Sequence, residues 1–426
     1  MFETFKNAWK SKDLRKKLLF TLLIIVLFRI GVAIPVPFLD ASKLSTLMGD
    51  ASLLGYMNML TGGALSKATI FAMSVTPYIN ASIIIQLLTV AIPALERLAK
   101  DGGEMGRKKI NKITRYTSVG LGLIQAIGFY FLLRSEGAVQ YTTGWSGIFA
   151  SFVICAAFTA GTALIMWLGE LVNEKGIGNG ISIIIFAGIL SRGPHAANTL
   201  WQYWKLAQGG DIQYYFLVPA IILLFVAVIA FVVVLTNAER RIPVQYAKRV
   251  VGRKMYGGQS SHIPIKVNLS GVMPVIFASS ILAIPSTIGA FMGADMNTGV
   301  WKWFSYSSWL YATIYFILII GFNYFYAATQ YNPIEMANNL RKSNGAIPLQ
   351  TRYHLRFHSE GTFQDHLLGA IFLGIVAILP IAIGNVAHMN IALGGTSMLI
   401  VVGVALDTSR TLESQMMMRH YKGFLE

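Results

Sequence analysis

Ten apolar stretches recur along the chain of 426 residues, most of them roughly 18–25 residues long, the length at which a helix crosses the hydrocarbon core of a bilayer. Only 13% of the residues are charged, whereas a soluble domain carries about 25%. The sequence therefore predicts an all-α integral membrane protein, and it excludes a soluble multidomain enzyme and a disulfide-stapled secreted domain. The ten predicted spans are 18–36, 74–93, 116–133, 147–169, 181–192, 215–236, 271–291, 309–329, 367–384 and 396–409.

Lys and Arg residues are distributed unevenly between the two sides of these spans. With the N-terminus inside, 28 of the 35 fall in cytoplasmic tails and loops, six fall on the outer side, and Arg29 lies within the first span. By the positive-inside rule, this bias predicts cytoplasmic N- and C-termini. We expect Arg29, which lies near the middle of its span, to pair with a carbonyl group or with a partner subunit.

Two of the cytoplasmic loops, 237–270 and 330–366, are long and basic. A connection between bundled helices usually takes only about 2–8 residues. Long basic loops favour a docking surface for an acidic protein or for RNA, although part of the charge bias is the ordinary topological signal of a multispan protein. Docking is the interpretation that we prefer.

The segment 57–73 does not have the pattern of an ordinary span. It is half-apolar, is broken by Gly62 and Gly63, carries Lys67, and lies on the outer side between the first two spans. A short helix placed before one that can cross the membrane is typical of a discontinuous helix that lines a cavity. An external amphipathic helix on the lipid surface explains the pattern equally well.

The second and seventh spans combine internal prolines with small polar side chains. These polar residues are Thr76, Asn80, Ser82, Gln86, Ser279 and Ser280. Proline loosens a helix, and polar bonds between membrane helices contribute only about 0.6 kcal/mol each. The pattern therefore indicates a helix pair that is able to separate, with ordinary small-residue packing as the alternative.

No Asp or Glu lies centrally in a predicted span, since Glu170 and Asp407 fall at cytoplasmic ends. Ion-coupled transporters usually place carboxylates at mid-membrane, so their absence weakens that interpretation. The chain has no HExxH motif and no phosphate-binding loop, and the glycine run 176–180 indicates a helix-joining turn. We expect no catalytic residue, no cofactor and no metal site, which leaves a pore or a transporter.

Several long strings resemble the SecY family, the central subunit of the bacterial protein-conducting channel. They include LTGGALSKATIFAMSVTPYINASIIIQLLTV (60–90), MWLGELVNEKGIGNGISIIIFAG (166–188) and ERRIPVQYAKRVVGRKMYGGQSSHIPIKVNLSGVMPVIFASSI (239–281). Two more are NPIEMANNLRKSNGAIP (332–348) and GGTSMLIVVGVALD (394–407). The resemblance runs in order from about Asn7 to the C-terminus.

This resemblance implies two inverted, pseudo-symmetric halves of five spans each, 1–205 and 206–426, with a short plug helix at about 57–70. The plug residues are Leu60, Thr61, Gly62, Gly63, Ala64, Leu65, Ser66 and Lys67. The family's apolar pore ring corresponds to Val75, Ile79, Ile185, Ile276 and Ile400. The lateral gate, through which hydrophobic segments reach lipid, corresponds to Asn80, Ser82, Gln86, Ser279 and Ser280.

The resemblance also implies partners. The subunits SecE and SecG are expected beside the bundle, and loops 237–270 and 330–366 are expected to dock the SecA motor ATPase or ribosomal RNA phosphates. The candidate docking residues are Arg240, Arg241, Lys248, Arg249, Arg253, Lys254, Arg352 and Arg356. After Pro348 the chain departs from the family, because Thr351 stands at the arginine of its Gly-Ile-Arg-Pro-Gly turn.

The implied function is that of a non-enzymatic protein-conducting channel in the bacterial plasma membrane. It would translocate unfolded preproteins and release transmembrane segments, including signal sequences, sideways into lipid. The alternative is a multispan secondary transporter for a small solute, which requires polar and charged residues at mid-membrane that the spans lack.

Overall fold

The computed structural model describes most of the chain. The described residues are 9–42, 63–100, 102–135, 137–209, 213–246, 249–251, 254–256, 260–268, 270–291, 299–304, 308–330, 342, 345–346, 367–379, 381–382 and 395–422.

Each of the first five predicted spans contains a helix. The helices of this part are α2 (Lys12–Gly31), α5 (Thr76–Ala91), α6 (Pro93–Lys100), α7 (Gly103–Ser135), α8 (Gly144–Lys175), α9 (Gly180–Leu190) and α10 (Gly193–Gln208). In the short fifth span most residues of α9 are buried, and α9 with α10 together forms one apolar stretch of 29 residues.

Each of the last five spans also contains a helix. These are α11 (Gln213–Asn237), α12 (Met273–Phe291), α13 (Trp309–Gln330), an unnumbered helix at Leu367–Leu379 and α16 (Gly395–Lys422), with the 3₁₀ helix η1 (Gly299–Phe304) between α12 and α13. Among the described residues, five helical stretches are long and apolar enough to cross a membrane, or six if α5 and α6 count as one. Helices α2 and α16 are not among these stretches, and both carry several charged residues.

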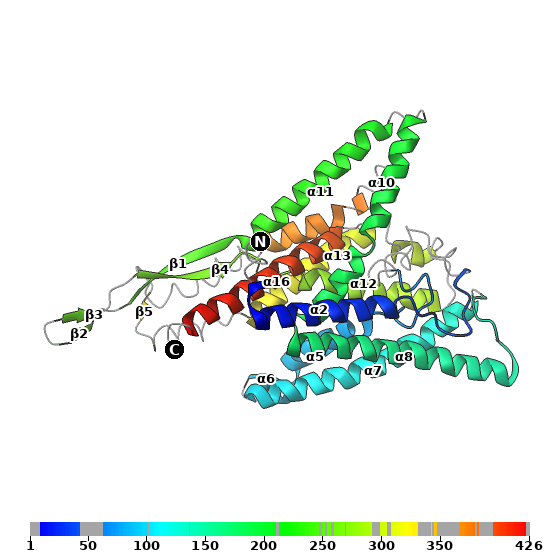
Figure 1. Ribbon diagram of the computed structural model, residues 1–426, viewed down its shortest axis with the longest axis horizontal. Helices are drawn as coiled ribbons and strands as arrows, with labels where there is room; N and C mark the ends of the chain where they lie inside the picture. Colours follow the sequence, from blue (N-terminus) through cyan, green and yellow to red (C-terminus); the bar gives the residue numbers. More distant parts are fainter. Residues whose placement is uncertain are drawn as a thin grey trace.

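The long loop 237–270 forms a β-hairpin. Strand β1 (Glu239–Tyr246) pairs antiparallel with β4 (Ser260–Lys266), and between them lies a smaller pair, β2 (Arg249–Val251) and β3 (Lys254–Tyr256). Strand β5 (Gly345–Ala346) of the other long loop pairs with the far end of β1. Figure 1 shows the hairpin projecting from the end of the bundle at which α2 begins and α16 ends, called here the terminal end.

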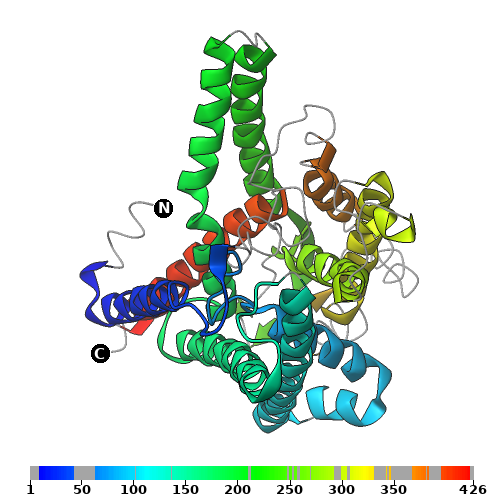
Figure 2. The same ribbon diagram turned by 90° about the vertical axis from the view of Figure 1, so that its right-hand side faces the viewer.

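Helices α10 and α11 form an antiparallel pair that stands out from the rest of the bundle (green, top of Figure 2). Their aromatic side chains hold the pair together at its tip, where the ring centroids of Tyr203 and Tyr214, and of Trp204 and Tyr215, are 5.3 Å apart. The other end of α11 packs against α16.

Helix α5 does not continue straight into α6. The chain turns by 105° at the break before Pro93, because proline cannot donate the backbone hydrogen bond that would continue the helix. Helix α6 then packs against the start of α7, where a side chain at Gly106 would collide with the carbonyl oxygen of Leu98.

The glycine run 176–180 joins α8 to α9, as predicted. The Asn179 side chain caps α9 by accepting a hydrogen bond from the Ile181 amide at 3.1 Å, and Asn173 Oδ1 accepts one from the Gly180 amide at 2.8 Å. A side chain at Gly180 would collide with the backbone of Gly169. The tight turn therefore requires glycine at this position.

Apolar side chains form a core in each half and a further one shared by both. One core lies between α7 and α8, and another joins α11, α12, α13 and the helix at 367–379. The shared core surrounds α9, and it includes Ile400 and Val404 of α16. Helix α16 therefore connects the two halves at the centre of the bundle.

Candidate functional site

A small apolar cavity of about 50 Å³ lies at the centre of the bundle. Its lining includes all five residues that the family resemblance assigns to a pore ring, Val75, Ile79, Ile185, Ile276 and Ile400. They come from the start of α5 and from α9, α12 and α16. A space of this size holds a few water molecules at most, so the branched side chains nearly close the centre of the bundle.

A larger cavity of about 610 Å³ opens toward the terminal end. It includes residues from one to two helical turns away from the small cavity, such as Ser182 on α9, Met273 on α12 and Val404 on α16. Its charged lining residues are Lys17, Glu174, Lys266, Asp407 and Arg410. The wider cavity, which has charged residues in its lining, and the narrow apolar cavity thus lie next to each other along the same three helices.

The segment before α5 lies inside the bundle. From Gly63 to Ser74 the described chain makes a series of turns, and the side chains of Ala64 and Leu65 are buried. Helix α8 passes so close that a side chain at Gly161 would collide with the carbonyl oxygen of Ile70. The alternative of an external helix lying on lipid is therefore wrong for these residues, and the prediction of a short helix is also wrong for 63–74, which form turns.

The predicted plug residues are only partly described. Leu60, Thr61 and Gly62 lie outside the described residues, whereas Ser66 is half-buried and Lys67 is exposed. The buried part is bound to the segment that follows α2, since the Val36 amide donates to the Ala68 carbonyl oxygen at 2.8 Å. The segment therefore fills the bundle beside the small cavity, to which Ser74 and Val75 contribute.

Helices α5, α12 and α13 meet along an apolar seam. Its buried members are Ile83, Phe277 and Tyr326, one from each helix. The Tyr326 hydroxyl donates to Gln86 Oε1 at 2.6 Å, so a polar contact joins α13 to α5. The sequence did not predict Tyr326, because a tyrosine within an aromatic-rich apolar span carries no polar pattern.

The other predicted gate residues have varied positions. Ser279 and Ser280 line the small cavity, and the Ser279 hydroxyl donates within its own helix to the Ile276 carbonyl oxygen at 2.8 Å. Asn80 and Ser82 are half-buried on α5. The structure thus brings α5 and α12 together, as the sequence predicts, and Gln86 makes its bond to α13.

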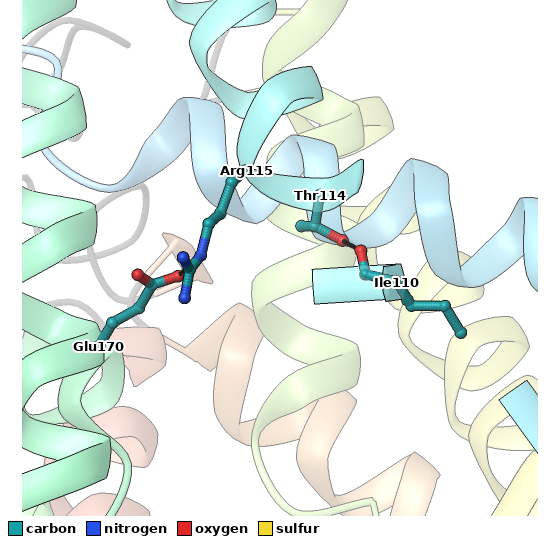
Figure 3. Close-up of polar contacts among 4 residues, drawn as sticks. All are labelled: Ile110, Thr114, Arg115 and Glu170. Atoms are coloured by element: carbon teal, nitrogen blue, oxygen red, sulfur yellow. Dashed lines mark hydrogen bonds and ion pairs between the residues drawn. The ribbon is translucent and has the colours of Figure 1, made fainter. Parts of the chain in front are cut away.

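An ion pair joins α7 to α8 on the side of the bundle that faces the terminal end. In Figure 3, the Arg115 guanidinium points toward Glu170 and donates to its carboxylate. One residue earlier along α7, the Thr114 hydroxyl donates to the Ile110 carbonyl oxygen at 3.0 Å. Glu170 is therefore partnered within the chain.

Arg29 makes a different contact from the one expected. It lies in the last turn of α2 rather than near its middle, and it donates to the Ser191 hydroxyl at the end of α9 at 2.8 Å. Its partner is therefore a side chain of the same protein.

The candidate docking residues that the structure describes lie on the β-hairpin. Arg240 and Arg241 are exposed on β1, and Arg249 and Lys254 belong to β2 and β3. The remaining four, Lys248, Arg253, Arg352 and Arg356, lie outside the described residues. Because β5 pairs with β1, the two long basic loops meet at this hairpin.

Known proteins resemble the chain over its whole length. The SecY family model matches residues 69–409. The protein translocase subunit SecY of Streptomyces scabiei is 42% identical over 442 residues, which cover all of both chains.

Two solved structures share the fold. One, described as a protein conducting channel, has a TM-score of 0.65 at 20% identity and covers 94% of this chain and 92% of that one. The other, Sec61 in the canine ribosome-channel complex from the endoplasmic reticulum, has a TM-score of 0.62 at 18% identity, with 94% and 92% covered. Since the family model and the full-length relative agree, this chain belongs to the SecY family.

Proposed function

We propose that this chain is the pore-forming subunit of a protein translocase, which passes unfolded preproteins through its centre. The observation that carries the proposal is the convergence of five aliphatic side chains on one small cavity. A larger cavity with charged lining residues lies next to it along the same helices. A ring of branched aliphatic groups excludes water and ions by dewetting, yet it has no charge to bind or reject a passing chain.

The proposed plug is the segment 57–70. Its support is the burial of Ala64 in the core that also contains Val75 and Ile185 of the small cavity. A segment in this position could close the path when no substrate is present. Displacement of the segment would then open the channel.

The proposed lateral gate is the seam that has α5 on one side and α12 with α13 on the other. An apolar signal sequence or membrane segment that enters the seam buries its surface in lipid and gains several kcal/mol, whereas the Tyr326–Gln86 contact opposes separation only weakly. Substrate segments therefore shift the gate toward its open state.

The proposed docking surface is the β1–β4 hairpin with β5. Its support is the exposed basic pair Arg240 and Arg241, which suits an acidic SecA surface or ribosomal RNA phosphates. The likeness to Sec61 of a ribosome-channel complex agrees with the ribosome as a partner. The terminal end then faces the bacterial cytoplasm.

SecE and SecG complete the proposed assembly, in which 1–205 and 206–426 are the two halves of this chain. The subunit is a passive channel, and its energy comes from SecA or from the membrane potential. Membership of the SecY family disfavours the small-solute transporter considered above.

Export in proteoliposomes tests the proposal. Vesicles with this chain, SecE, SecG, SecA and ATP should take up a preprotein, and Ile185→Ser with Ile400→Ser should increase ion leakage because the ring becomes polar. Ile184→Ser is the matched control, since Ile184 is buried beside Ile185 but does not line the small cavity. Vesicles that import no preprotein, or a control that leaks as much as the ring variant, would contradict the proposal.

A further inference from the structure

The orientation of the β-hairpin is determined at the end of α11. Helix α11 ends at Asn237 and strand β1 begins at Glu239, so a single residue separates them. On the return strand, Lys266 pairs with Glu239, and the Val267 amide donates to the Ala238 carbonyl oxygen at 3.1 Å. The base of the hairpin therefore follows any tilt of the last turn of α11.

A side chain from α16 holds that last turn. The Arg410 guanidinium donates to the Thr236 carbonyl oxygen at 2.9 Å and to Asn237 Oδ1 at 2.6 Å. The last carbonyl groups of a helix have no partner within the helix, and they form the negative end of its dipole. Arg410 thus supplies a charged donor where α11 needs one, and bonds of this kind are stronger than neutral ones.

The same helix carries a residue of the pore ring. Helix α16 is continuous from Gly395 to Lys422, and Ile400 lies ten residues before Arg410, about 15 Å along the axis at the usual helical rise. Ile400 and Val404 are packed into the core around α9. Helix α16 is therefore a single continuous element with the small cavity near its start and Arg410 near its middle.

We propose that Arg410 is a positioning residue that couples the docking hairpin to the pore ring through α16. A partner that tilts the hairpin moves the end of α11, and Arg410 passes that movement to α16 and Ile400. The coupling rests on the proposed docking and channel functions. The contact of Arg410 with Thr236 and Asn237, called here the anchor, does not depend on them.

The anchor is tested without transport. Spin labels at His262 on β4 and Met417 on α16, both exposed, are introduced in a Cys155→Ser background in lipid nanodiscs. The label-to-label distance distribution should be narrow in the parent protein, broad in Arg410→Ala and intermediate in Asn237→Ala and Arg410→Lys. Arg107→Ala is the matched control, because it removes an exposed arginine at the terminal end that lies outside this contact.

The coupling is tested in proteoliposomes with SecA. Arg410→Ala should bind SecA with a Kd within about twofold of the parent, while SecA-driven export falls about tenfold, the effect of losing a charge-assisted hydrogen bond; Arg410→Lys should recover part of the export. A distance distribution unchanged in Arg410→Ala would overturn the anchor. An export defect that weaker SecA binding fully explains would overturn the coupling. Parent protein that exports nothing refutes the proposed function instead, and the distance measurement still decides the anchor.

Discussion

Replacing Tyr326 by Phe should favour the open gate. The change removes the hydroxyl that donates to Gln86 at 2.6 Å and keeps the ring, whose centroid is 5.3 Å from that of Phe277. The apolar seam therefore persists while the polar contact between α13 and α5 is lost. Gln86 is half-buried, so water can satisfy the freed oxygen and the substitution should not unfold the protein.

The expected shift follows from the strength of such bonds in membrane proteins. A polar contact between membrane helices contributes about 0.6 kcal/mol on average and about 1.7 kcal/mol at most. The ratio of open to closed gates should then rise about threefold, and no more than about 20-fold. We expect the open probability of single channels in planar bilayers to rise by this factor, with more export of a preprotein that has a weakened signal sequence.

The same substitution elsewhere on α13 provides the control. Tyr315 also donates from its hydroxyl, but to the Val275 carbonyl oxygen of α12 at 3.3 Å, so its bond stays on one side of the proposed gate. Tyr315→Phe should leave the open probability near the parent value. An unchanged or lower open probability in Tyr326→Phe would refute the reasoning, as would an equal rise in both variants.

Three further predictions concern the plug, the hairpin and the α7–α8 ion pair. Deleting residues 60–68 should leave a folded protein with raised ion leakage, because buried Ala64 and Leu65 are lost; parent-like conductance would argue against a plug. Arg240→Glu with Arg241→Glu should weaken SecA binding by about 0.5–1 kcal/mol per residue at low salt, and by less at high salt. Lys302→Glu on η1 is the control. If the charge-reversed protein bound SecA as well as the parent does, the proposed docking surface would be rejected. Glu170→Arg should lower the unfolding temperature in detergent, because the free energy of unfolding falls by about 1 kcal/mol when the pair with Arg115 is lost. Adding Arg115→Glu to the same chain should restore the unfolding temperature. A double variant as unstable as the single one would count against a specific pair.

The sequence predicts the helices well because a membrane imposes a length and an apolar composition on each span. All ten spans contain a helix, and α10 extends the short fifth one to an apolar stretch of 29 residues. The β-hairpin was interpreted only as a long loop, since its strands are basic and proline-containing and lack a regular apolar alternation.

Residues that meet in space were harder to predict. Ile185 and Ile400 are 215 positions apart and look like any other span residues, so their convergence came only from the family resemblance. Arg410 was counted as one cation of the C-terminal tail, although it caps the end of α11. Periodicity describes one helix at a time, and such contacts depend on how the helices pack.

The 105° bend between α5 and α6 limits how the proposed gate can move. With α5 upright in the bilayer, α6 lies close to the membrane plane, where its Glu96 and Arg97 favour the headgroup layer. A piston-like slide of α5 along its axis would drag these charges into hydrocarbon, at a cost of a few kcal/mol. Sideways tilting about the bend leaves α6 in place. Helix α5 is therefore restricted to rotating about its junction with α6.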